Sequence, residues 1–266
     1  FSAGDTLELV GPDAAPTAFA APVMAGMTGQ DSQDRSIMIL GMGSGTYASY
    51  CDRIFPGTRI QGAEIDQKIA DIATDYFNLP DSVEVAVADG RAYLTASEDR
   101  YDVIMVDAYQ DITIPFQLSS VEFFTQVSEH LKDNGVMVVN LNMASDKEGS
   151  INDYLCDTMG SVFRHVYTVD VPGNTNREVF CTNSDNLEQV FADSLKELEW
   201  ADYRDVMEQV SQQLEEYQPG NLILTDDKAP VELLGMQVLD EIIGDELAYY
   251  KDLFTSGNLS LSDLMG

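Results

Sequence analysis

The sequence predicts an α/β fold, in which a mostly parallel β-sheet carries helices on both faces. Short apolar runs alternate with helix-length stretches from residue 36 onward, which is typical of parallel strands joined by right-handed helical crossovers. Four of these runs end in glycine or an acid, as strand ends do when they face a ligand. With 44% hydrophobic residues, the 266-residue chain can build a large core.

The first 35 residues form a lead-in to the sheet. We expect a strand at 6–10 and a helix at 17–27, followed by a linker at 29–34 that is rich in Gly, Gln, Asp and Ser. The alternating pattern then predicts five strands and four helices. The strands are expected at 36–41, 58–63, 82–87, 101–106 and 134–142, and the helices at 44–55, 66–78, 90–96 and 119–132.

Two further apolar runs predict a hairpin at the edge of the sheet. After an expected helix at 149–161, the strands at 163–171 and 178–182 are joined by a connection of Pro, Gly and Asn, which favours a tight antiparallel turn. Seven strands that end in a hairpin distinguish a Rossmann-like, class I methyltransferase-type sheet from a six-stranded dinucleotide-binding one. We therefore assign residues 36–184 to a Rossmann-like nucleoside-binding catalytic domain.

Residues 185–266 are expected to form a helical extension packed on the same domain. Its helices are expected at 186–199, 201–216, 230–243 and 245–255. No apolar stretch reaches the roughly 18 residues of a membrane span, and the best candidate, 14–27, is interrupted by two prolines. Because the chain begins with Phe1 rather than Met, we expect it to be part of a longer or processed protein.

The charge of the chain narrows the classes of partner. Acidic residues outnumber basic ones 46 to 14, which gives a net charge of −32. A field of this sign repels phosphates, which argues against a nucleic-acid partner, whereas it attracts polycations such as polyamines. A solvated surface adapted to solubility or salt also accounts for such a charge.

The cysteines and histidines argue against a disulfide framework or a metal site. Cys51, Cys156 and Cys181 form no Cys-x-x-Cys pair, and each falls in an expected helix or strand. This pattern indicates buried free thiols in a reducing compartment, and so a cytoplasmic location. His130 and His165 lie far apart and lack acids at metal-ligand spacing, so we expect no metal.

The segment Gly41-Met42-Gly43-Ser44-Gly45 follows an apolar strand and precedes a helix. A Gly-x-Gly-x-Gly turn at this place presents backbone N–H groups at a helix N-terminus and lets a ligand lie across it. It is not a Walker loop, because no Gly-Lys-Ser/Thr follows. The turn is compatible with a dinucleotide, with S-adenosylmethionine or its decarboxylated form, and with a purely structural role.

Acids follow the second and third expected strands. Glu64 ends the second strand, where an acid can accept hydrogen bonds from both ribose hydroxyls. Asp89 follows the third strand and could accept from an adenine amine, with Gly90 allowing close approach. For Asp89 the alternative is an N-cap of the next helix, and for Asp66 we expect an N-cap rather than a ligand contact.

Asp107 ends the fourth expected strand, beside the crevice where the order of the strands reverses. A carboxylate there can take a proton from an attacking amine, or orient that amine. We therefore name Asp107 as the catalytic candidate. A structural acid at the end of a strand is the alternative.

Several stretches resemble the spermidine synthase (polyamine aminopropyltransferase) family, over roughly residues 17–183. They are Glu64-Ile65-Asp66, Asp89-Gly90, Asp102-Val103-Ile104-Met105-Val106-Asp107, Pro115, Phe123-Phe124 and Leu131-Lys132-Asp133-Asn134-Gly135-Val136. A later stretch, 224–232, is similar to spermidine synthase-like domains fused behind membrane transporter-like regions. A parent of that kind would place the chain at the cytoplasmic face of a membrane.

The resemblance implies transfer of an aminopropyl group from decarboxylated S-adenosylmethionine to an amine such as putrescine, leaving methylthioadenosine and needing no metal. The glycine turn would line the nucleoside, Glu64 would hold the ribose, Asp89 with Gly90 would meet the adenine, and Asp107 would activate the attacking amine. The loop after Asp107 would contact this small-molecule amine through Tyr109, Gln110 and Asp111. A homodimer is one expected assembly.

Two residues depart from the pattern of that family. Ser44 stands where the glycine loop usually carries an acid that holds the cationic amine of the donor, and Gln110 stands where a second acid is usual. The N-terminal β-domain of ordinary members is also nearly absent before Thr17. Ser44 and Gln110 favour one alternative, an S-adenosylmethionine-dependent methyltransferase on the same fold. A second alternative is a non-catalytic module, attached to a membrane protein, that senses a nucleoside or polyamine.

Overall fold

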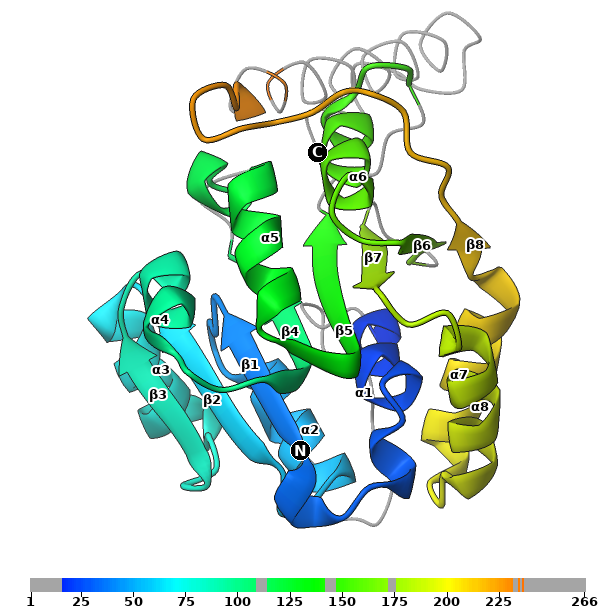
Figure 1. The fold of residues 1–266 in the computed structure, drawn as a ribbon. Coiled ribbons are helices and arrows are strands. Elements are labelled where there is room, and N and C mark those ends of the chain that lie inside the picture. The colour runs from blue at the N-terminus through cyan, green and yellow to red at the C-terminus, as the bar shows by residue number, and fades with distance from the viewer. Residues whose placement is uncertain are drawn as a thin grey trace, which may run out of the picture.

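An eight-stranded sheet forms the centre of the computed structural model, which describes residues 16–108, 114–141, 147–171, 176–231, 234 and 236. The strand order is β3-β2-β1-β4-β5-β7-β6-β8 (Figure 1). The strands are β1 (Ser36–Leu40), β2 (Arg59–Glu64), β3 (Val83–Val87), β4 (Tyr101–Val106), β5 (Leu131–Leu141), β6 (His165–Asp170), β7 (Arg177–Thr182) and β8 (Glu215–Glu216).

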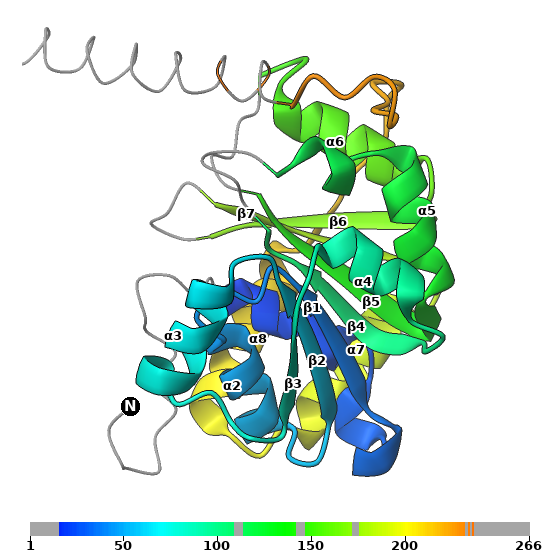
Figure 2. The same cartoon turned by 90° about the vertical axis from the view of Figure 1, so that its left-hand side faces the viewer.

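Helices cover both faces of this sheet, which confirms the α/β fold. In Figure 2, α4, α5 and α6 lie on one side of the strands, and α2, α3 and α8 lie on the other. The α-helices are α1 (Ala20–Met24), α2 (Thr46–Ile54), α3 (Gln67–Phe77), α4 (Gly90–Ala96), α5 (Val121–Glu129), α6 (Ile151–Gly160), α7 (Leu187–Glu197) and α8 (Ala201–Gln213). Short 3₁₀ turns are η1 (Pro16–Phe19), η2 (Met27–Gly29), η3 (Ser32–Asp34) and η4 (Phe116–Leu118).

The direction of the strands determines which residues meet at the edge of the sheet. Strands β1 to β5 pair in parallel, so the chain leaves each of them at the same edge. Strand β7 pairs antiparallel with both β5 and β6, as the expected hairpin requires. Because β7 runs the opposite way, its first residues lie at the edge where the parallel strands end.

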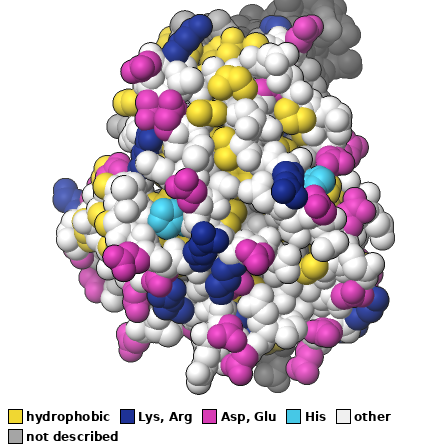
Figure 3. Space-filling view, in the orientation of Figure 1, with side chains coloured by type: hydrophobic (Ala, Val, Ile, Leu, Met, Phe, Trp, Pro, Cys, Tyr) yellow, Lys and Arg dark blue, Asp and Glu magenta, His cyan; other side chains and the backbone are white. Residues whose placement is uncertain are grey.

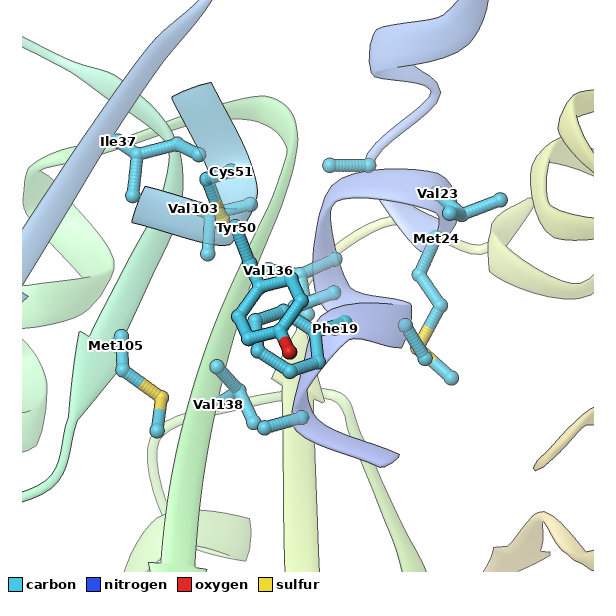
Figure 4. Close-up of a cluster of buried hydrophobic side chains, with 14 of the residues drawn as sticks. Phe19, Val23, Met24, Ile37, Tyr50, Cys51, Val103, Met105, Val136 and Val138 are labelled. Atoms are coloured by element: carbon cyan, nitrogen blue, oxygen red, sulfur yellow. The ribbon is translucent and has the colours of Figure 1, made fainter. Parts of the chain in front are cut away.

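Successive strand residues alternate between two apolar cores, because side chains on a strand point to opposite faces. Ile37 and Ile39 of β1 belong to one core, and Met38 and Leu40 belong to the other. In the first core, the ring of Phe19 packs 4.9 Å from that of Tyr50. Figure 4 shows the strand residues around this pair, which are Ile37, Val103, Met105, Val136 and Val138.

The lead-in and the helices after the hairpin cover the same face of the sheet. Helix α1 packs against α7, and the hydroxyl of Tyr203 in α8 donates to the carbonyl of Phe19 at 2.5 Å. The helix expected at 17–27 is shorter than predicted, since α1 has five residues between η1 and η2. Part of the expected linker forms η3, and the expected strand at 6–10 lies outside the described residues.

Two expected helices end earlier than the sequence suggested, because tertiary contacts remove their last residues. The helix predicted at 119–132 ends at Glu129, since Leu131 pairs with Tyr101 and is buried in the second core. The helix predicted at 201–216 ends at Gln213, because the chain adds β8 to the edge of the sheet beside β6. Pairing partners distant in sequence therefore decide both ends.

The segment after β8 runs back over α6 and α5 (Figure 1). Asp226 forms a bidentate ion pair with Arg91 of α4, with N···O distances of 2.7 and 2.9 Å, and also accepts from the Ser120 hydroxyl. Residues 231, 234 and 236 of the helix expected at 230–243 are helical. The helix expected at 245–255 lies outside the described residues. No helix in the described part of the chain is long and apolar enough to cross a membrane.

A buried carboxylate joins the lead-in to three neighbouring strands. Asp102, at the start of β4, accepts hydrogen bonds from the Ser36 backbone N–H at 2.8 Å and from the Lys132 ammonium at 2.7 Å. Its other oxygen accepts from the side-chain amide of Gln30 at 3.2 Å. A buried carboxylate with charge-assisted donors on both oxygens stabilises the arrangement of the groups that it joins.

We expect Asp102→Ala to lower the free energy of unfolding by about 2–4 kcal/mol, because it leaves the buried backbone N–H of Ser36 without its acceptor and the Lys132 ammonium without its carboxylate partner. Urea unfolding of the purified chain measures this loss. Asp99→Ala is the matched control, since the ion pair of Asp99 with Arg59 is about half exposed and should contribute less than about 1 kcal/mol. Equal, small losses in the two variants would contradict the anchoring role.

Candidate functional site

A cavity of about 220 Å³ lies at the edge of the sheet where β1 and β4 end. The turn after β1, the start of α2, the ends of β4 and β5, the start of β7 and the 3₁₀ turn η1 all contribute to its wall. Of the predicted site residues, Gly43, Ser44 and Asp107 line this cavity. Its other described lining residues are Ala18, Phe19, Met42, Thr46, Tyr47, Met105, Asn140 and Glu178.

Three polar residues form a row across neighbouring strands at this edge. Asn140 of β5 lies directly opposite Glu178 of β7, and Asp107 follows Val106, which pairs with Val139. By the two-residue period of strands, all three side chains point to the face of the first core. The fold therefore brings together an acid, an amide and a second acid from distant parts of the sequence.

Asp107 is oriented by a chain of two side-chain amides. One of its oxygens accepts from the Asn140 amide at 3.2 Å, and the Asn140 carbonyl oxygen accepts from the Asn176 amide at 2.8 Å. Burial raises the pKa of Asp107, and the Asn140 hydrogen bond opposes part of that rise. The result is a fixed carboxylate with increased basicity, which suits a group that accepts a proton.

Glu178 is an acid of the cavity that sequence analysis missed. Its side chain is fully buried, and neither carboxylate oxygen has a hydrogen-bond partner among the described residues. Burial first, and then the nearby Asp107, raise the pKa of Glu178 well above its ordinary value. The available signal was the strand period, because Glu178 stands two residues before Phe180, a core residue of the same face.

The glycine turn approaches the end of β4 closely. Gly41 has a φ of 87°, and a Cβ there would lie 2.5 Å from the carbonyl oxygen of Asp107, so this position excludes other residues. Gly43 also has a positive φ, 54°, but a Cβ there would meet nothing within 4 Å. At Gly43 the turn therefore presents backbone without a side chain to the cavity.

Glu64 supports the glycine turn through a hydrogen bond to its backbone. It is buried, and its two oxygens accept from the backbone N–H groups of Gly43, at 2.9 Å, and Asp66, at 3.0 Å. Asp66 in turn caps α3 by accepting from the backbone N–H of Lys68 at 2.8 Å, which confirms the N-cap expected for this residue. Glu64 therefore does not line the cavity itself, but its carboxylate holds Gly43, which does.

The remaining predicted residues lie at different places in the structure. Asp89 caps α4 through the backbone N–H of Ala92 at 2.8 Å, and Gly90 begins that helix; neither lines the cavity. The Ser44 hydroxyl pairs with that of Thr46 at 2.8 Å. Gly45 precedes α2 with a positive φ. Tyr109, Gln110 and Asp111 lie outside the described residues.

The cysteines are free thiols, and the described residues offer no cluster of metal ligands. Cys51, Cys156 and Cys181 are buried and unpaired, as expected, and burial raises the pKa of each thiol. In the described residues, His, Cys, Asp and Glu side chains form no group of three or more that could hold a metal ion.

Comparison with known proteins relates the sequence to one family and the fold to several solved structures. A sequence model of the Spermine/spermidine synthase domain matches residues 23–193. A probable polyamine aminopropyl transferase of Bifidobacterium longum is 48% identical over 256 residues, which cover 89% of this chain and 56% of the relative. The chain spans about half the length of the curated relatives it matches.

Two solved structures share the fold at 20% identity and a TM-score of 0.58. One is a probable spermidine synthase from Corynebacterium glutamicum, with 78% of this chain and 79% of the other covered. The second is human methyltransferase-like protein 13 in complex with SAH, with 76% and 94% covered. At 20% identity this likeness shows the fold alone, and the two solved structures share that fold.

We expect Asn140→Ala to raise the pKa of the Asp107 carboxyl, because the amide N–H of Asn140 stabilises the ionised form. Carbon-13 NMR of the aspartate carboxyl carbons, with the Asp107 signal assigned from an Asp107→Asn variant, follows this titration. Asn183→Ala, which changes an exposed amide bonded to Ser128, serves as the control and should leave the titration unchanged. An unchanged Asp107 titration in Asn140→Ala would contradict the orienting role.

Proposed function

Because the chain belongs to the spermine/spermidine synthase family, we propose that it is a spermidine synthase-like transferase. It would move an aminopropyl group from decarboxylated S-adenosylmethionine to an amine acceptor such as putrescine, giving methylthioadenosine. The observation that carries this proposal is Asp107, a partly buried carboxylate that Asn140 orients toward a cavity walled by the glycine turn. A base in that position is what attack by an amine requires.

The residues of the glycine turn fit an adenosyl donor. When bound, such a donor supplies an electrophilic carbon next to a sulfonium. Gly43 leaves open space where a side chain would stand. The carboxylate of Glu64 fixes the backbone of the turn by accepting from the Gly43 N–H. We propose that the turn, including Gly41, Ser44 and Gly45, lines the nucleoside, with Glu64 toward the ribose. Asp89 and Gly90 are proposed for the adenine end, as the resemblance implies.

Asp107 has the properties of a group that accepts a proton from the amine. An aliphatic amine has a pKa of about 10, so near neutral pH it must lose a proton before it can attack. The raised pKa of Asp107 makes the carboxylate a stronger base. The Asn140 hydrogen bond holds one carboxylate oxygen in place, and the other oxygen would accept the proton. We propose Tyr109, Gln110 and Asp111, which follow Asp107 in the chain, as contacts of the amine substrate.

The net charge of the chain and its buried cysteines also support this assignment. Acidic side chains are scattered over the face shown in Figure 3, with Lys and Arg side chains among them. The net charge of −32 would raise the local concentration of a polyamine substrate. The three buried free thiols support a reducing, cytoplasmic location for the activity.

A methyltransferase is the second candidate function, and one observation favours it. Ser44 places a neutral hydroxyl on the cavity wall, where the family resemblance would place an acid. The two functions require different donors. Calorimetric titration with S-adenosylmethionine and with its decarboxylated form separates them, and we expect tighter binding of the decarboxylated form. Tighter binding of S-adenosylmethionine would favour the methyltransferase instead.

We expect the purified chain to release methylthioadenosine from decarboxylated S-adenosylmethionine in the presence of putrescine or a related amine. Asp107→Asn should lower the turnover rate by about 100- to 10,000-fold, because the amide cannot accept the proton of the amine. The rate of methylthioadenosine release, followed by liquid chromatography, measures both. Asp205→Asn, at an exposed position of α8, is the matched control and should keep the full rate. No release with any di- or polyamine would overturn the proposed function.

A further inference from the structure

Glu178 is the most deeply buried acid of the cavity, with 0% of its surface exposed. It comes from β7, two strands away from Asp107, and lies on the same face of the sheet. Neither of its oxygens is hydrogen-bonded within the described residues, although buried carboxylates in folded proteins are almost always paired. An acid in this state indicates a partner that the described residues do not supply.

The surroundings of Glu178 favour a cationic partner. Among the described lining residues of the cavity, none is Lys, Arg or His. The titratable groups that face it are Asp107, at the end of β4, and Tyr47, on α2. The stacked rings of Tyr47 and Phe19, with centroids 5.1 Å apart, also line the cavity. Two acids beside aromatic rings form an environment that attracts an ammonium ion and repels a carboxylate.

Building on the transferase function proposed above, we propose that Glu178 is a specificity-determining residue that binds the primary ammonium group of an aliphatic amine. It would act as the second carboxylate of a cation subsite whose first carboxylate is Asp107. Ser44, another lining residue of the cavity, supplies no charge, so β7 would provide the acid that the glycine turn lacks. Both the aminopropyl donor and the amine acceptor carry such an ammonium group.

Selection of the donor follows from the same two charges. S-adenosylmethionine differs from its decarboxylated form by a carboxylate next to its ammonium group. In a cavity that already contains Asp107 and Glu178, this third negative charge is repelled. Without Glu178, one of the two charges that exclude it is lost, so discrimination between the donors should decrease.

Binding of an ammonium ion should also release a proton. Without a cation, burial and Asp107 favour the neutral form of Glu178. When the ammonium binds, Glu178 gives its proton to solvent and becomes a carboxylate, while the ammonium keeps its own three N–H bonds. Calorimetry in two buffers of different ionisation enthalpy counts the released protons. We expect wild-type protein to release more protons per ammonium ligand than Glu178→Gln.

The main test compares wild-type protein, Glu178→Gln and the control Glu215→Gln, which removes one exposed acid of β8. The probes are decarboxylated S-adenosylmethionine, S-adenosylmethionine, putrescine and the uncharged methylthioadenosine, titrated by calorimetry. We expect Glu178→Gln to bind at least one ammonium probe about 10- to 100-fold more weakly, with methylthioadenosine affinity unchanged. A loss confined to the decarboxylated donor assigns the subsite to the donor, and a loss confined to putrescine assigns it to the acceptor.

Several outcomes would overturn the role of Glu178. These are unchanged affinity for both the decarboxylated donor and putrescine, an equal loss for all four probes, or the same proton release in Glu178→Gln as in wild type. Thermal unfolding confirms that Glu178→Gln is folded; its Tm at pH 8 should equal or exceed that of wild type, because Gln removes a buried acid. Proton release by the wild-type protein needs no variant. Turnover is scored separately, so an inactive chain would contradict the transferase function while the binding ratios still decide on Glu178.

Discussion

Two carboxyl groups share one small cavity at the end of the sheet, and this electrostatic constraint organises the site. Asp107 has a single amide donor among the described residues, and Glu178 has none. Charges of the same sign in a partly apolar space raise the free energy of each other's ionised form. The site is therefore complete only with a cation, and its walls, formed by η1, the glycine turn and three strands, determine which cation fits.

The fold was largely predictable because it follows from local patterns. The alternation of apolar runs and helix-length stretches placed β1 to β5, and two further apolar runs with the connection between them predicted β6 and β7 as an antiparallel hairpin. Helix ends were less predictable, because Leu131 and the residues of β8 leave their expected helices to pair with strands distant in sequence. Such pairing depends on the order of strands, which no local window contains.

The candidate site was predictable only in part, because acids at strand ends look alike in a sequence. Glu64, Asp66 and Asp89 all accept from backbone N–H groups, so they hold a turn or begin a helix. Asp107 instead accepts from a side-chain amide and borders the cavity. Asn140, which makes that difference, is a polar residue within an apolar strand, and its importance becomes visible only once β5 lies between β4 and β7.

The antiparallel course of β7 gives its register an unusual importance. Glu178 lies opposite Asn140, between Arg177 and Val179, and the neighbours of an inward-facing residue point away from the cavity. A slip of β7 by one residue would bring either a guanidinium or a valine opposite Asn140. The alignment of the β6–β7 hairpin thus decides whether the cavity carries a second negative charge, a positive charge or none, so ligand preference is encoded in strand registration as much as in residue identity.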